Sequence, residues 1–404
     1  MHKVIVLLFS IILTSATYAS TSVEVRAVWL TTNGGLDWPG KIKSVEEQKK
    51  SMTDMLDKLK DANFNLVIFQ VQANGDVLWK SSIQPPMDAV TGDGSKPLSF
   101  DVCRFVIDEC HKRDMECHAW IVPFRVGTKK QALKYAYNKV KHPVKSQSQL
   151  CINYKGTLYL DPGNPKTRGY LIKLYSELVE KYDFDGINLD YTRYPGNDFP
   201  DNHSYSKRKD KKQSKNDWRR NNINAFVKDL YKMVKSKKPH ILLGSAPIGT
   251  YKNVGGYKNA TAYDSFQQDP GQWISSGCHD LVIPQMYWDE KSGFSTHMST
   301  WENTAKSSCH LVVGLAPYKI IDSGWTSDLV VSQILKTRNS IGVEGVCFFR
   351  AEHVIGSNPK IKSLYNRLKN DIFKNPADLP WRHSKAETIY TDDSSSEPYN
   401  PFLE

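Results

Sequence analysis

The sequence predicts a single TIM (β/α)8 barrel with extended loops at the C-terminal face, and three observations support this fold class. Short apolar runs alternate with helical patterns eight times along the chain, which indicates a parallel sheet covered by helices. The chain has 404 residues, enough for one barrel of about 250 residues with insertions. No glycine-rich phosphate-binding motif follows any of the apolar runs, which argues against an open nucleotide-binding sheet.

Hydrophobic periodicity places each element. The expected strands are Glu24–Thr32, Asn65–Asn74, Glu116–Pro123, Gly186–Tyr191, Ile241–Pro247, Leu281–Trp288, Leu311–Tyr318 and Glu344–Arg350. The expected helices are Val45–Asn63, Leu98–Arg113, Pro165–Tyr182, Asp217–Lys237, Phe266–Ser276, His297–Ser307, Ser327–Ile341 and Pro359–Phe373. Two insertions, 127–161 and 196–216, are expected at the C-terminal face, where long loops shape a binding cleft.

The segment 185–195, DGINLDYTRYP, indicates where the site lies. Side chains alternate across a strand, so Ile187 and Leu189 face one way while Asn188 and Asp190 face the other. Asp190 then ends the fourth strand, at the face where barrel enzymes carry their active sites. The nearby guanidinium of Arg193 would keep the carboxyl ionised or orient it, because an adjacent cation lowers the pKa of an Asp.

The same alternation predicts polar side chains that point inward at the ends of other strands. Strands buried on both faces are normally apolar, so these side chains need hydrogen-bond partners, which sugar hydroxyls would supply. Aromatic rings beside them would be platforms for a sugar ring, although each ring could equally belong to the core. The expected substrate-binding residues are Trp29, Gln70, Gln72, Asn74, Asp76, His118, Trp120, Arg125, Tyr191, Arg193, Tyr194, Gln285, Tyr287, Trp288 and Arg350.

The two ends of the chain differ from the barrel in composition. Lys3 precedes the apolar run 4–13, and small residues follow up to Ala19, which is typical of a secretory signal peptide. We therefore expect a signal peptide at 1–19, the barrel at 20–375 and a polar, poorly ordered or surface-draped tail at 376–404. The mature protein would be periplasmic or extracellular, and without stable membrane insertion, because the apolar run is too short to span a bilayer.

The net charge and the spacing of the cysteines limit the binding partners and metal sites that the sequence predicts. The net charge of +11 favours anionic partners, but the basic residues lack the clustered motifs of nucleic-acid readers, so no nucleic acid is expected. The densest basic run, 207–215, is expected to be solvated, with a weak hold on an acidic cell-surface polymer as the alternative. The seven cysteines lack zinc-ligand spacing and are expected to be buried thiols with at most one or two disulfides. No metal and no cofactor is expected.

Nine motifs occur in order between about Glu24 and Asn370. They are VRAVWLTTNGGLDWP (25–39), NLVIFQVQANGD (65–76), CHAWIVPFRV (117–126), LDPGNP (160–165), DGINLDYTRYP (185–195), DWRRNNIN (217–224), PQMYW (284–288), GLAPY (314–318) and FFR (348–350). With these motifs the chain resembles the glycosyl hydrolase-like 10 family of bacterial exported proteins. The resemblance implies a TIM-type barrel, glycoside hydrolysis and envelope glycans as substrates, including peptidoglycan strands stripped of their peptides.

Two of these motifs, DGINLDYTRYP and PQMYW, are also similar to the fourth and sixth strands of family-18 chitinases. Those read D-G-x-D-x-D-x-E-Y-P, in which the last Asp helps the acetamido group of the substrate attack the anomeric carbon and the Glu is the general acid. Asp190 matches the last Asp and Asn188 the one before it, but Thr192 and Arg193 lie where the Glu would be. A simple chitinase mechanism is therefore not expected.

Glycoside hydrolysis needs an acid that protonates the leaving oxygen and a second carboxylate, or a substrate acetamide, at the anomeric carbon. We take Asp190 as the first catalytic carboxylate. Its predicted partner is Asp289, which is in phase with Gln285 and Tyr287 if the sixth strand continues. Other candidates for the second role are Asp76, Glu352 and Asp37.

Two other functions are compatible with the sequence. A non-catalytic carbohydrate-binding barrel would keep the aromatic residues and lack the acid after Asp190. A metal-dependent sugar deacetylase would use His118 and Asp190, but no second His lies at ligand spacing. For this reason we expect chelators to leave any activity unchanged.

Overall fold

The computed structural model describes residues 22–42, 44–306 and 308–382. Within these ranges nine parallel strand segments form the central sheet, in the order β12-β11-β10-β9-β5-β3-β2-β14-β13. Two of them, β12 (His310–Leu311) and β13 (Val313–Leu315), are halves of one run. Gly314 N–H donates to the Pro284 carbonyl at 3.0 Å, so the two edges of the sheet meet and the barrel is nearly closed.

The other barrel strands lie where the sequence predicts them. They are β2 (Val25–Leu30), β3 (Leu66–Ala73), β5 (Glu116–Ile121), β9 (Gly186–Leu189), β10 (Leu242–Ser245), β11 (Leu281–Val282) and β14 (Gly345–Phe349). Most are a few residues shorter than expected, but β11 ends six residues before the predicted Trp288. A two-residue strand, β4 (Asp76–Val77), returns antiparallel on the end of β3.

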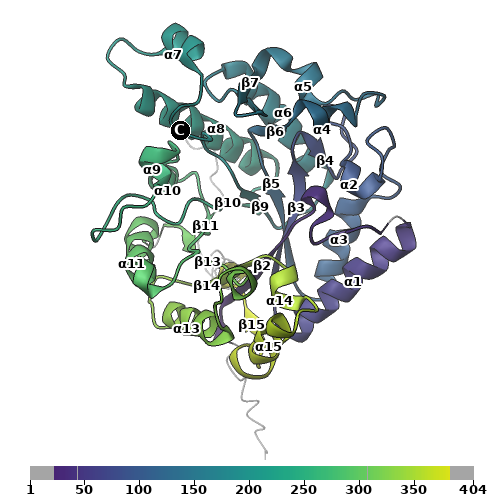
Figure 1. Ribbon diagram of the computed structural model, residues 1–404, viewed down its shortest axis with the longest axis vertical. Helices are drawn as coiled ribbons and strands as arrows, with labels where there is room; N and C mark the ends of the chain where they lie inside the picture. Colours follow the sequence, from purple (N-terminus) through teal and green to yellow (C-terminus); the bar gives the residue numbers. More distant parts are fainter. Residues whose placement is uncertain (1–21, 43, 307, 383–404) are drawn as a thin grey trace, which may run out of the picture.

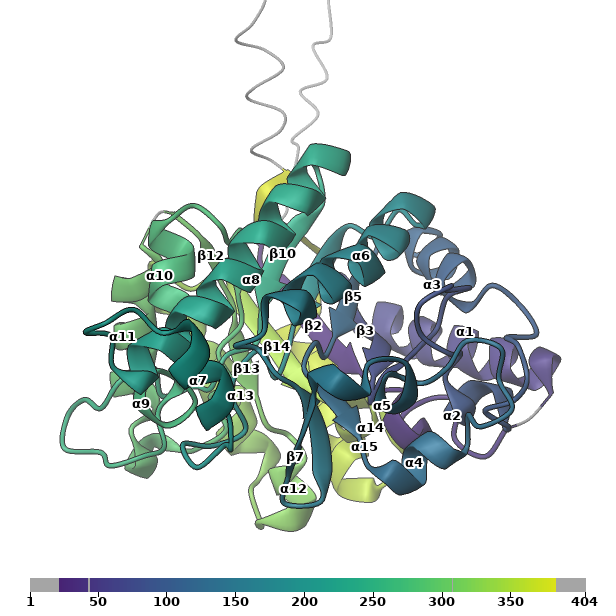
Figure 2. The same ribbon diagram turned by 90° about the horizontal axis from the view of Figure 1, so that it is seen from above.

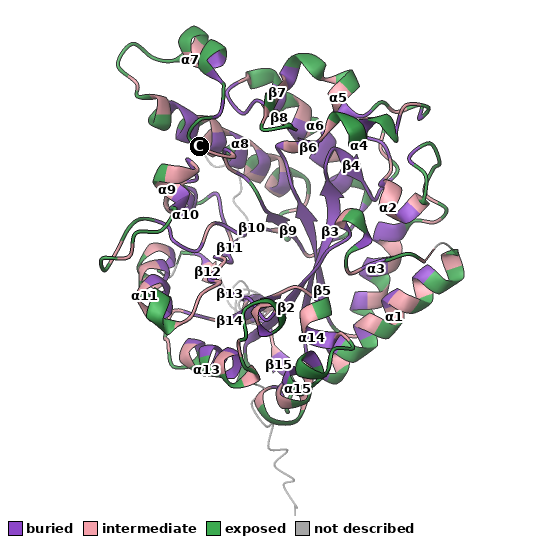
Figure 3. Cartoon of the chain, in the orientation of Figure 1, coloured by how far each residue is buried: buried purple, intermediate pink, exposed green. Residues whose placement is uncertain are grey.

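Helices surround the strands in a ring (Figure 1). They are α1 (Val45–Asp61), α3 (Val102–His111), α6 (Pro165–Lys181), α8 (Lys215–Lys237), α10 (Pro270–Ser275), α11 (Phe294–Ala305), α13 (Ser327–Arg338) and α15 (Pro359–Arg367), followed by η4 (Leu368–Ile372). Most begin at a residue whose side chain accepts a backbone N–H of the first turn, as Ser44 does for α1 and Asn164 for α6. Their inner faces are buried and their outer faces exposed, as the amphipathic patterns predict (Figure 3). The predicted end of the sixth helix, Ser307, lies outside the described residues.

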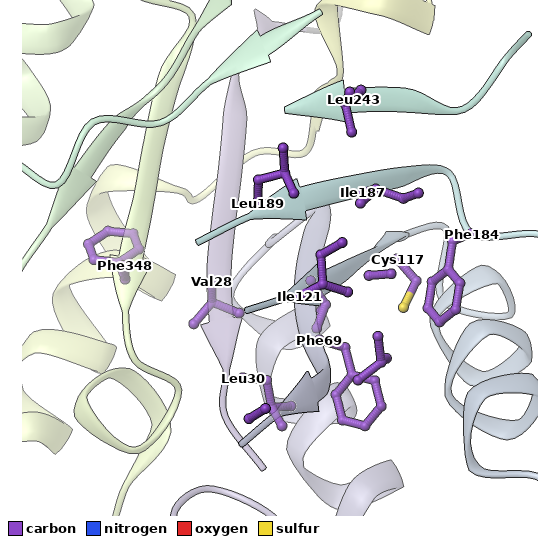
Figure 4. Close-up of a cluster of buried hydrophobic side chains, with 14 of the residues drawn as sticks. Val28, Leu30, Phe69, Cys117, Ile121, Phe184, Ile187, Leu189, Leu243 and Phe348 are labelled. Atoms are coloured by element: carbon purple, nitrogen blue, oxygen red, sulfur yellow. The ribbon is translucent and has the colours of Figure 1, made fainter. Parts of the chain in front are cut away.

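Two apolar layers follow from the alternation of side chains along each strand. Val67, Phe69 and Val71 pack outward against the helices, as predicted. Ile187 and Leu189 belong to the same outer layer, and Figure 4 shows them beside other outward side chains of neighbouring strands. The inner layer fills the barrel itself and contains Val25, Ala27, Trp29, Leu66, Ile68, Trp120, Val122, Ala246, Leu281, Ile283, Val312, Cys347, Leu379 and Trp381.

The last described residues close the floor of the barrel, and this corrects the predicted boundary of the tail. β15 (Ala377–Asp378) pairs with β1 (Ser22–Val23). Beyond it, Leu379 and Trp381 enter the inner apolar layer, with 0% and 5% of their surface exposed. Residues 377–382 are therefore part of the barrel, while 383–404 lie outside the described residues.

Short elements gather at the opposite end, where the strands point. They are η1 (Asn33–Gly35), α2 (Asp88–Thr91), β6 (Arg125–Gly127), α4 (Lys129–Leu133), α5 (Pro143–Ser146), β7 (Cys151–Tyr154), β8 (Thr157–Leu160), α7 (Asn202–Arg208), η3 (Glu290–Ser292), α12 (Lys319–Asp322) and α14 (Glu352–Ile355). Figure 2 shows β7, α4 and α12 on the same side of the barrel. The insertion 127–161 contains most of a three-stranded sheet, β6-β8-β7, that the sequence did not predict.

The structure also bears on the predictions for the cysteines, the basic run and the N-terminus. All seven cysteines are free thiols, six of them buried, as the default expectation had it. The basic run 207–215 covers the end of α7 and the start of α8, and most of its side chains are exposed. Within the described ranges, no helix has the length and apolarity needed to cross a membrane. The predicted signal peptide falls outside these ranges.

Candidate active site

Asp190 lies at the end of β9, where the parity of the strand places it. Its backbone N–H donates to the Ile121 carbonyl at 3.0 Å. Its carboxyl Oδ1 accepts the Tyr191 N–H at 2.7 Å and the Gln285 amide at 3.1 Å. The residue is 3% exposed, and burial raises the pKa of its carboxyl against the opposing influence of Arg193 and these hydrogen bonds. Asp190 is therefore a buried carboxyl whose protonated form is favoured relative to an ordinary Asp.

Aromatic rings of several strands meet beside this carboxyl. Phe349 lies 6.1 Å from Trp29, 6.3 Å from Trp120 and 5.8 Å from Tyr287, measured between ring centroids. Tyr318 lies 6.0 Å from Tyr287. Phe349 and Tyr318 were not predicted as site residues, although Phe349 is the last residue of β14 and Tyr318 ends the motif GLAPY three residues beyond β13, so both could have been found by position.

Arg193 and Tyr191 form the exposed side of the site. The guanidinium carbon of Arg193 lies 4.4 Å from the ring of Tyr191 and 5.4 Å from that of Phe266. Tyr191 is 49% exposed. The charge of Asp190 raises the pKa of the Tyr191 phenol, and the guanidiniums of Arg193 and Arg125 oppose that shift. The predicted residues Asp190, Trp120, Arg125, Tyr191, Arg193, Gln285 and Tyr287 are thus brought together.

Three other predicted residues support the site from within the protein. Gln70 Oε1 accepts the Thr31 hydroxyl at 2.7 Å and the Asn33 N–H at 2.8 Å, so it holds the loop after β2. Gln72 Oε1 accepts the Val122 N–H at 2.8 Å. Trp29 is 1% exposed and its indole N–H points at the Asn188 amide oxygen, 3.4 Å away. Because these side chains are buried and each makes a hydrogen bond within the protein, they position the walls of the site, although the Gln72 amide nitrogen has no partner among the described atoms.

Arg350 has a structural partner as well. Its guanidinium forms an ion pair with Asp37, whose side chain is 0% exposed. Asp37 also accepts the backbone N–H of Thr31 at 2.8 Å and of Glu352 at 3.1 Å. Burial raises the pKa of Asp37, against the effect of Arg350. This pair joins the ends of β2 and β14, so Asp37 is engaged and does not serve as a free second carboxylate.

The predicted partner Asp289 lies seven residues beyond the end of β11 and caps a short helix, so the strand alternation on which its assignment rested does not apply. β11 ends at Val282, and the N–H groups of Met286 and Tyr287 turn back to the carbonyls of Pro284 and Gln285 at 3.0 and 3.1 Å. The two-residue period does not hold through such turns. Asp289 instead caps η3 by accepting the Ser292 N–H at 3.1 Å.

Trp288 is displaced by the same turns. Its ring lies 5.2 Å from that of His297 on α11 and packs against the outer apolar layer. The indole therefore faces the helices and not the interior of the barrel. Trp288 is not positioned to stack on a sugar beside Asp190.

We expect Asp289→Ala to leave kcat within about twofold of the unaltered enzyme, because this carboxyl serves only a helix cap. The free energy of unfolding should fall by about 1 kcal/mol, the usual contribution of an N-cap. Steady-state kinetics together with urea unfolding would measure both. A loss of activity in a folded variant would restore Asp289 as a catalytic candidate.

His118 lies near the floor of the barrel, far along its strand from the end that carries Asp190. Its Nε2 is 3.3 Å from Glu116 Oε2, and its ring lies 6.2 Å from that of Trp381. The reason is its position: His118 is the third residue of β5, whereas the site residues lie near or beyond the C-terminal ends of their strands. His118 and Asp190 are thus not a metal-binding pair, and the described residues contain no cluster of three or more His, Cys, Asp or Glu suited to a metal.

Tyr194 also lies away from the site. It is 0% exposed, its ring packs 5.6 Å from Phe199, and the Arg219 guanidinium lies 4.8 Å from it. Arg219 in turn donates to Asp201 at 2.7 and 2.8 Å. Tyr194 therefore anchors the insertion 196–216, a role that its place in the motif does not reveal.

Asn74 and Asp76 form a separate polar cluster on the same face. Asn74 donates its amide to Asn33 Oδ1 at 2.7 Å. Asp76 is in contact with the Tyr135 hydroxyl, and burial raises the pKa of its carboxyl to about 8. Tyr135 comes from the insertion 127–161, so the sequence offered no signal for its contact with Asp76.

The comparison with known proteins decides the family. The model of the family described as glycosyl hydrolase-like 10 matches residues 24–328. The chain belongs to this family. Glycosyl hydrolase YngK of Bacillus subtilis (strain 168) is 31% identical over 397 residues, covering 91% of this chain and 76% of YngK. Glycosyl hydrolase DigH of Escherichia coli (strain K12) is 32% identical over 392 residues, covering 88% of this chain and 89% of DigH.

Solved structures agree on the fold. The glycoside hydrolase domain of PgaB (BpsB) from Bordetella bronchiseptica superposes with a TM-score of 0.57 at 14% identity, covering 86% of this chain and 99% of that one. A putative α-L-fucosidase from Bacteroides thetaiotaomicron superposes with a TM-score of 0.51 at 11% identity, covering 92% and 98%. Membership of the glycosyl hydrolase-like 10 family makes this protein a glycoside hydrolase and confirms the predicted enzyme class.

Proposed function

We propose that this glycoside hydrolase cleaves N-acetylhexosamine-containing glycans of the bacterial envelope, with peptide-free peptidoglycan strands as the first substrate to test. The observation that carries the proposal is the surroundings of Asp190. Its carboxyl is buried, and it accepts hydrogen bonds from the Gln285 amide and the Tyr191 backbone N–H, not from another acid. A substrate that brings its own nucleophile suits such a site.

The four candidate partners all have other surroundings. Asp289 caps η3, and Asp37 pairs with Arg350. Asp76 contacts Tyr135, and Glu352 is an exposed residue at the start of α14. Retaining hydrolysis normally uses two carboxyls, but an acetamido group on the substrate replaces the second one in some families. The surroundings of these four carboxyls therefore support participation by the acetamido group of the substrate.

The reaction can be written with Asp190 as the acid. Protonated Asp190 gives its proton to the glycosidic oxygen while the acetamido carbonyl oxygen of the same sugar attacks the anomeric carbon, and the bond to the leaving sugar breaks. Water then attacks the anomeric carbon, opens the cyclic intermediate and returns a proton to Asp190. A carboxyl whose pKa is raised by burial is suited to this role, because it holds a proton nearer to neutral pH.

Access to the carboxyl involves Tyr191. Asp190 is 3% exposed, so a saccharide reaches it only when a neighbouring side chain moves. Tyr191 is the half-exposed neighbour. Its ring rests on Arg193, and displacement of that ring by a sugar would uncover the acid. Burial around the reacting groups would then be completed by the substrate itself.

Incubation of the pure protein with peptide-free peptidoglycan strands and with chito-oligosaccharides, followed by mass spectrometry, tests the function. We expect shorter glycans from at least one of them. Fully deacetylated glucosamine oligomers of the same length are the matched control and should be cleaved at under about 1% of that rate, because they lack the nucleophile. Equal cleavage of the control would contradict participation by the acetamide, and intact glycans throughout would contradict the substrate class.

We also propose that the protein acts outside the cytoplasm. The pattern at residues 1–19 supports export, and envelope glycans lie in that compartment. Fractionation of cells that produce the full chain would show the protein in the periplasm or the medium. Retention in the cytoplasm with an uncleaved N-terminus would contradict this proposal.

A further inference from the structure

A small cavity of about 60 Å³ lies at the C-terminal face on the side of β2 and β3. Its walls come from η1, the turn between β3 and β4, the start of α2, and α4 with the residues just after it. Asn33, Asn74, Asp76, Met87, Asp88 and Lys134 are among its lining residues. The cavity thus shares the face that carries Asp190, but it is built from different strands.

Two buried acceptors in this cavity have no partner. Asn74 Oδ1 and Asp76 Oδ1 are both inaccessible, and neither has a hydrogen bond to another described atom. The residues are 9% and 5% exposed. Buried polar atoms are almost always paired in folded proteins, so unpaired acceptors lining a cavity indicate a donor that is bound there.

The contacts of Asn74 fix the direction of its side-chain oxygen. The Asn74 amide nitrogen donates to Asn33 Oδ1 at 2.7 Å, which turns the Asn74 oxygen the other way. The Asn74 carbonyl is 2.7 Å from His142 Nε2, and a Cβ on Gly75 would lie only 2.8 Å from that nitrogen. The turn is therefore held between two rigid groups, and its geometry depends on glycine at position 75, where φ is +80°.

The second oxygen of Asp76 is engaged by Tyr135. The phenol oxygen of Tyr135 contacts Asp76 Oδ2 and is also 3.1 Å from Asp88 Oδ1, while Asp88 pairs with Lys134 at 2.5 Å. A phenol has one proton and cannot donate to both carboxyls, so the proton of a neutral Asp76 fits the second contact. Oδ1 of Asp76 then remains a carbonyl-type acceptor without a partner, on a residue that lines the cavity.

The volume and the charge of the cavity limit the chemical groups that can bind in it. A cavity of about 60 Å³ holds one or two small groups, since a water in the liquid occupies roughly 30 Å³. Asp88 and Lys134 neutralise each other, so an uncharged donor such as a hydroxyl or an amide N–H matches the two free acceptors better than an ion does.

We propose that this cavity is a subsite that receives a hydroxyl or amide N–H substituent of the bound glycan, with Asn74 Oδ1 and Asp76 Oδ1 as its acceptors. This proposal rests on the proposed function, because it takes the glycan as the ligand. The subsite selects sugars by a substituent and contributes to binding, while the reaction takes place at Asp190.

The test measures glycan binding without turnover. Calorimetry would compare Asp190→Asn with the double variant Asp190→Asn/Asp76→Ala, using chitohexaose and peptide-free peptidoglycan strands as probes. We expect Asp76→Ala to weaken binding by about tenfold, the usual effect of one lost hydrogen bond. Asp76→Asn is the conservative rescue, because its amide can donate to Tyr135 and keep its oxygen toward the cavity. Asp108→Ala, on the exposed part of α3, is the matched control and should change nothing.

The outcomes distinguish failure of the subsite from failure of the proposed function. Equal affinity of Asp190→Asn and the double variant, with both folded by thermal unfolding, overturns the subsite and leaves the proposed function standing. Loss of affinity in Asp76→Ala with recovery in Asp76→Asn supports the subsite. Failure of Asp190→Asn and of the unaltered enzyme to bind or cleave either probe overturns both proposals. A crystal of Asp190→Asn with chitohexaose that shows only water in the cavity also overturns the subsite.

Discussion

Replacing Asp190 with Asn is expected to lower kcat by about 10²–10⁴-fold, the range that a general acid usually contributes. The amide has the shape of the carboxyl and can still accept the Tyr191 N–H and the Gln285 amide through its oxygen. It has no proton with which to assist departure of the leaving sugar. Product release from chito-oligosaccharides or peptide-free peptidoglycan strands, followed over time, would measure the loss.

The same variant should be at least as stable as the unaltered protein near neutral pH. Burial raises the pKa of Asp190 in the folded state above its unfolded value, so the folded protein binds more protons there than the unfolded chain. Stability from this group is therefore present below the unfolded pKa and is lost as pH rises through the folded pKa. Asn does not ionise and removes that loss.

The two measurements together separate catalysis from folding. Urea unfolding at a series of pH values from 3.8, the ordinary pKa of an Asp, up to 8 should show Asp190→Asn gaining stability relative to the unaltered protein as pH rises. Gln285→Ala is a useful comparison, because it removes a partner of the carboxyl while leaving the acid in place. Turnover by Asp190→Asn at the unaltered rate would remove Asp190 from the mechanism.

Trp381→Ala is expected to lower the free energy of unfolding by about 3–5 kcal/mol, as removal of a buried large aromatic side chain does. Trp381 is 5% exposed and fills the floor of the barrel. Its indole N–H donates to Glu116 Oε2 at 2.9 Å, and its ring lies 5.1 Å from that of His310. Removal of the ring leaves an internal cavity and takes one hydrogen bond from Glu116, which keeps its contacts with His118 and Arg382.

Two further variants serve as comparisons for Trp381→Ala. Trp381→Phe keeps most of the ring but loses the bond to Glu116, so a smaller loss of about 1–2 kcal/mol is expected. Tyr137→Ala removes a ring that is 91% exposed and should stay within about 0.5 kcal/mol. Urea unfolding would compare all three. Because the floor lies at the opposite end from Asp190, kcat of the folded Trp381 variants should be unchanged. Stability of Trp381→Ala equal to that of Tyr137→Ala would show that the segment is not part of the core.

The sequence by itself determined the barrel and the place of its principal acid. Alternation of apolar and polar residues along a strand is a local property, and it correctly placed Ile187 and Leu189 outside and Asp190 inside. The helices followed from their spacing and from capping residues such as Ser44. These features need only neighbours along the chain, so they can be deduced without knowledge of distant contacts.

The tertiary structure alone decided which polar groups share a site. Asp289 is out of phase with the sixth strand because β11 stops at Val282. Where that strand stops depends on how the neighbouring elements pack and not on the apolar pattern of the strand. Likewise, residues 377–382 read as a polar tail, yet the open floor of the barrel accepts Trp381 because burying the indole there removes apolar surface from water. The contact of Asp76 with Tyr135 joins residues 59 apart in the chain. Closure of the chain on itself creates such contacts, and no local periodicity encodes them.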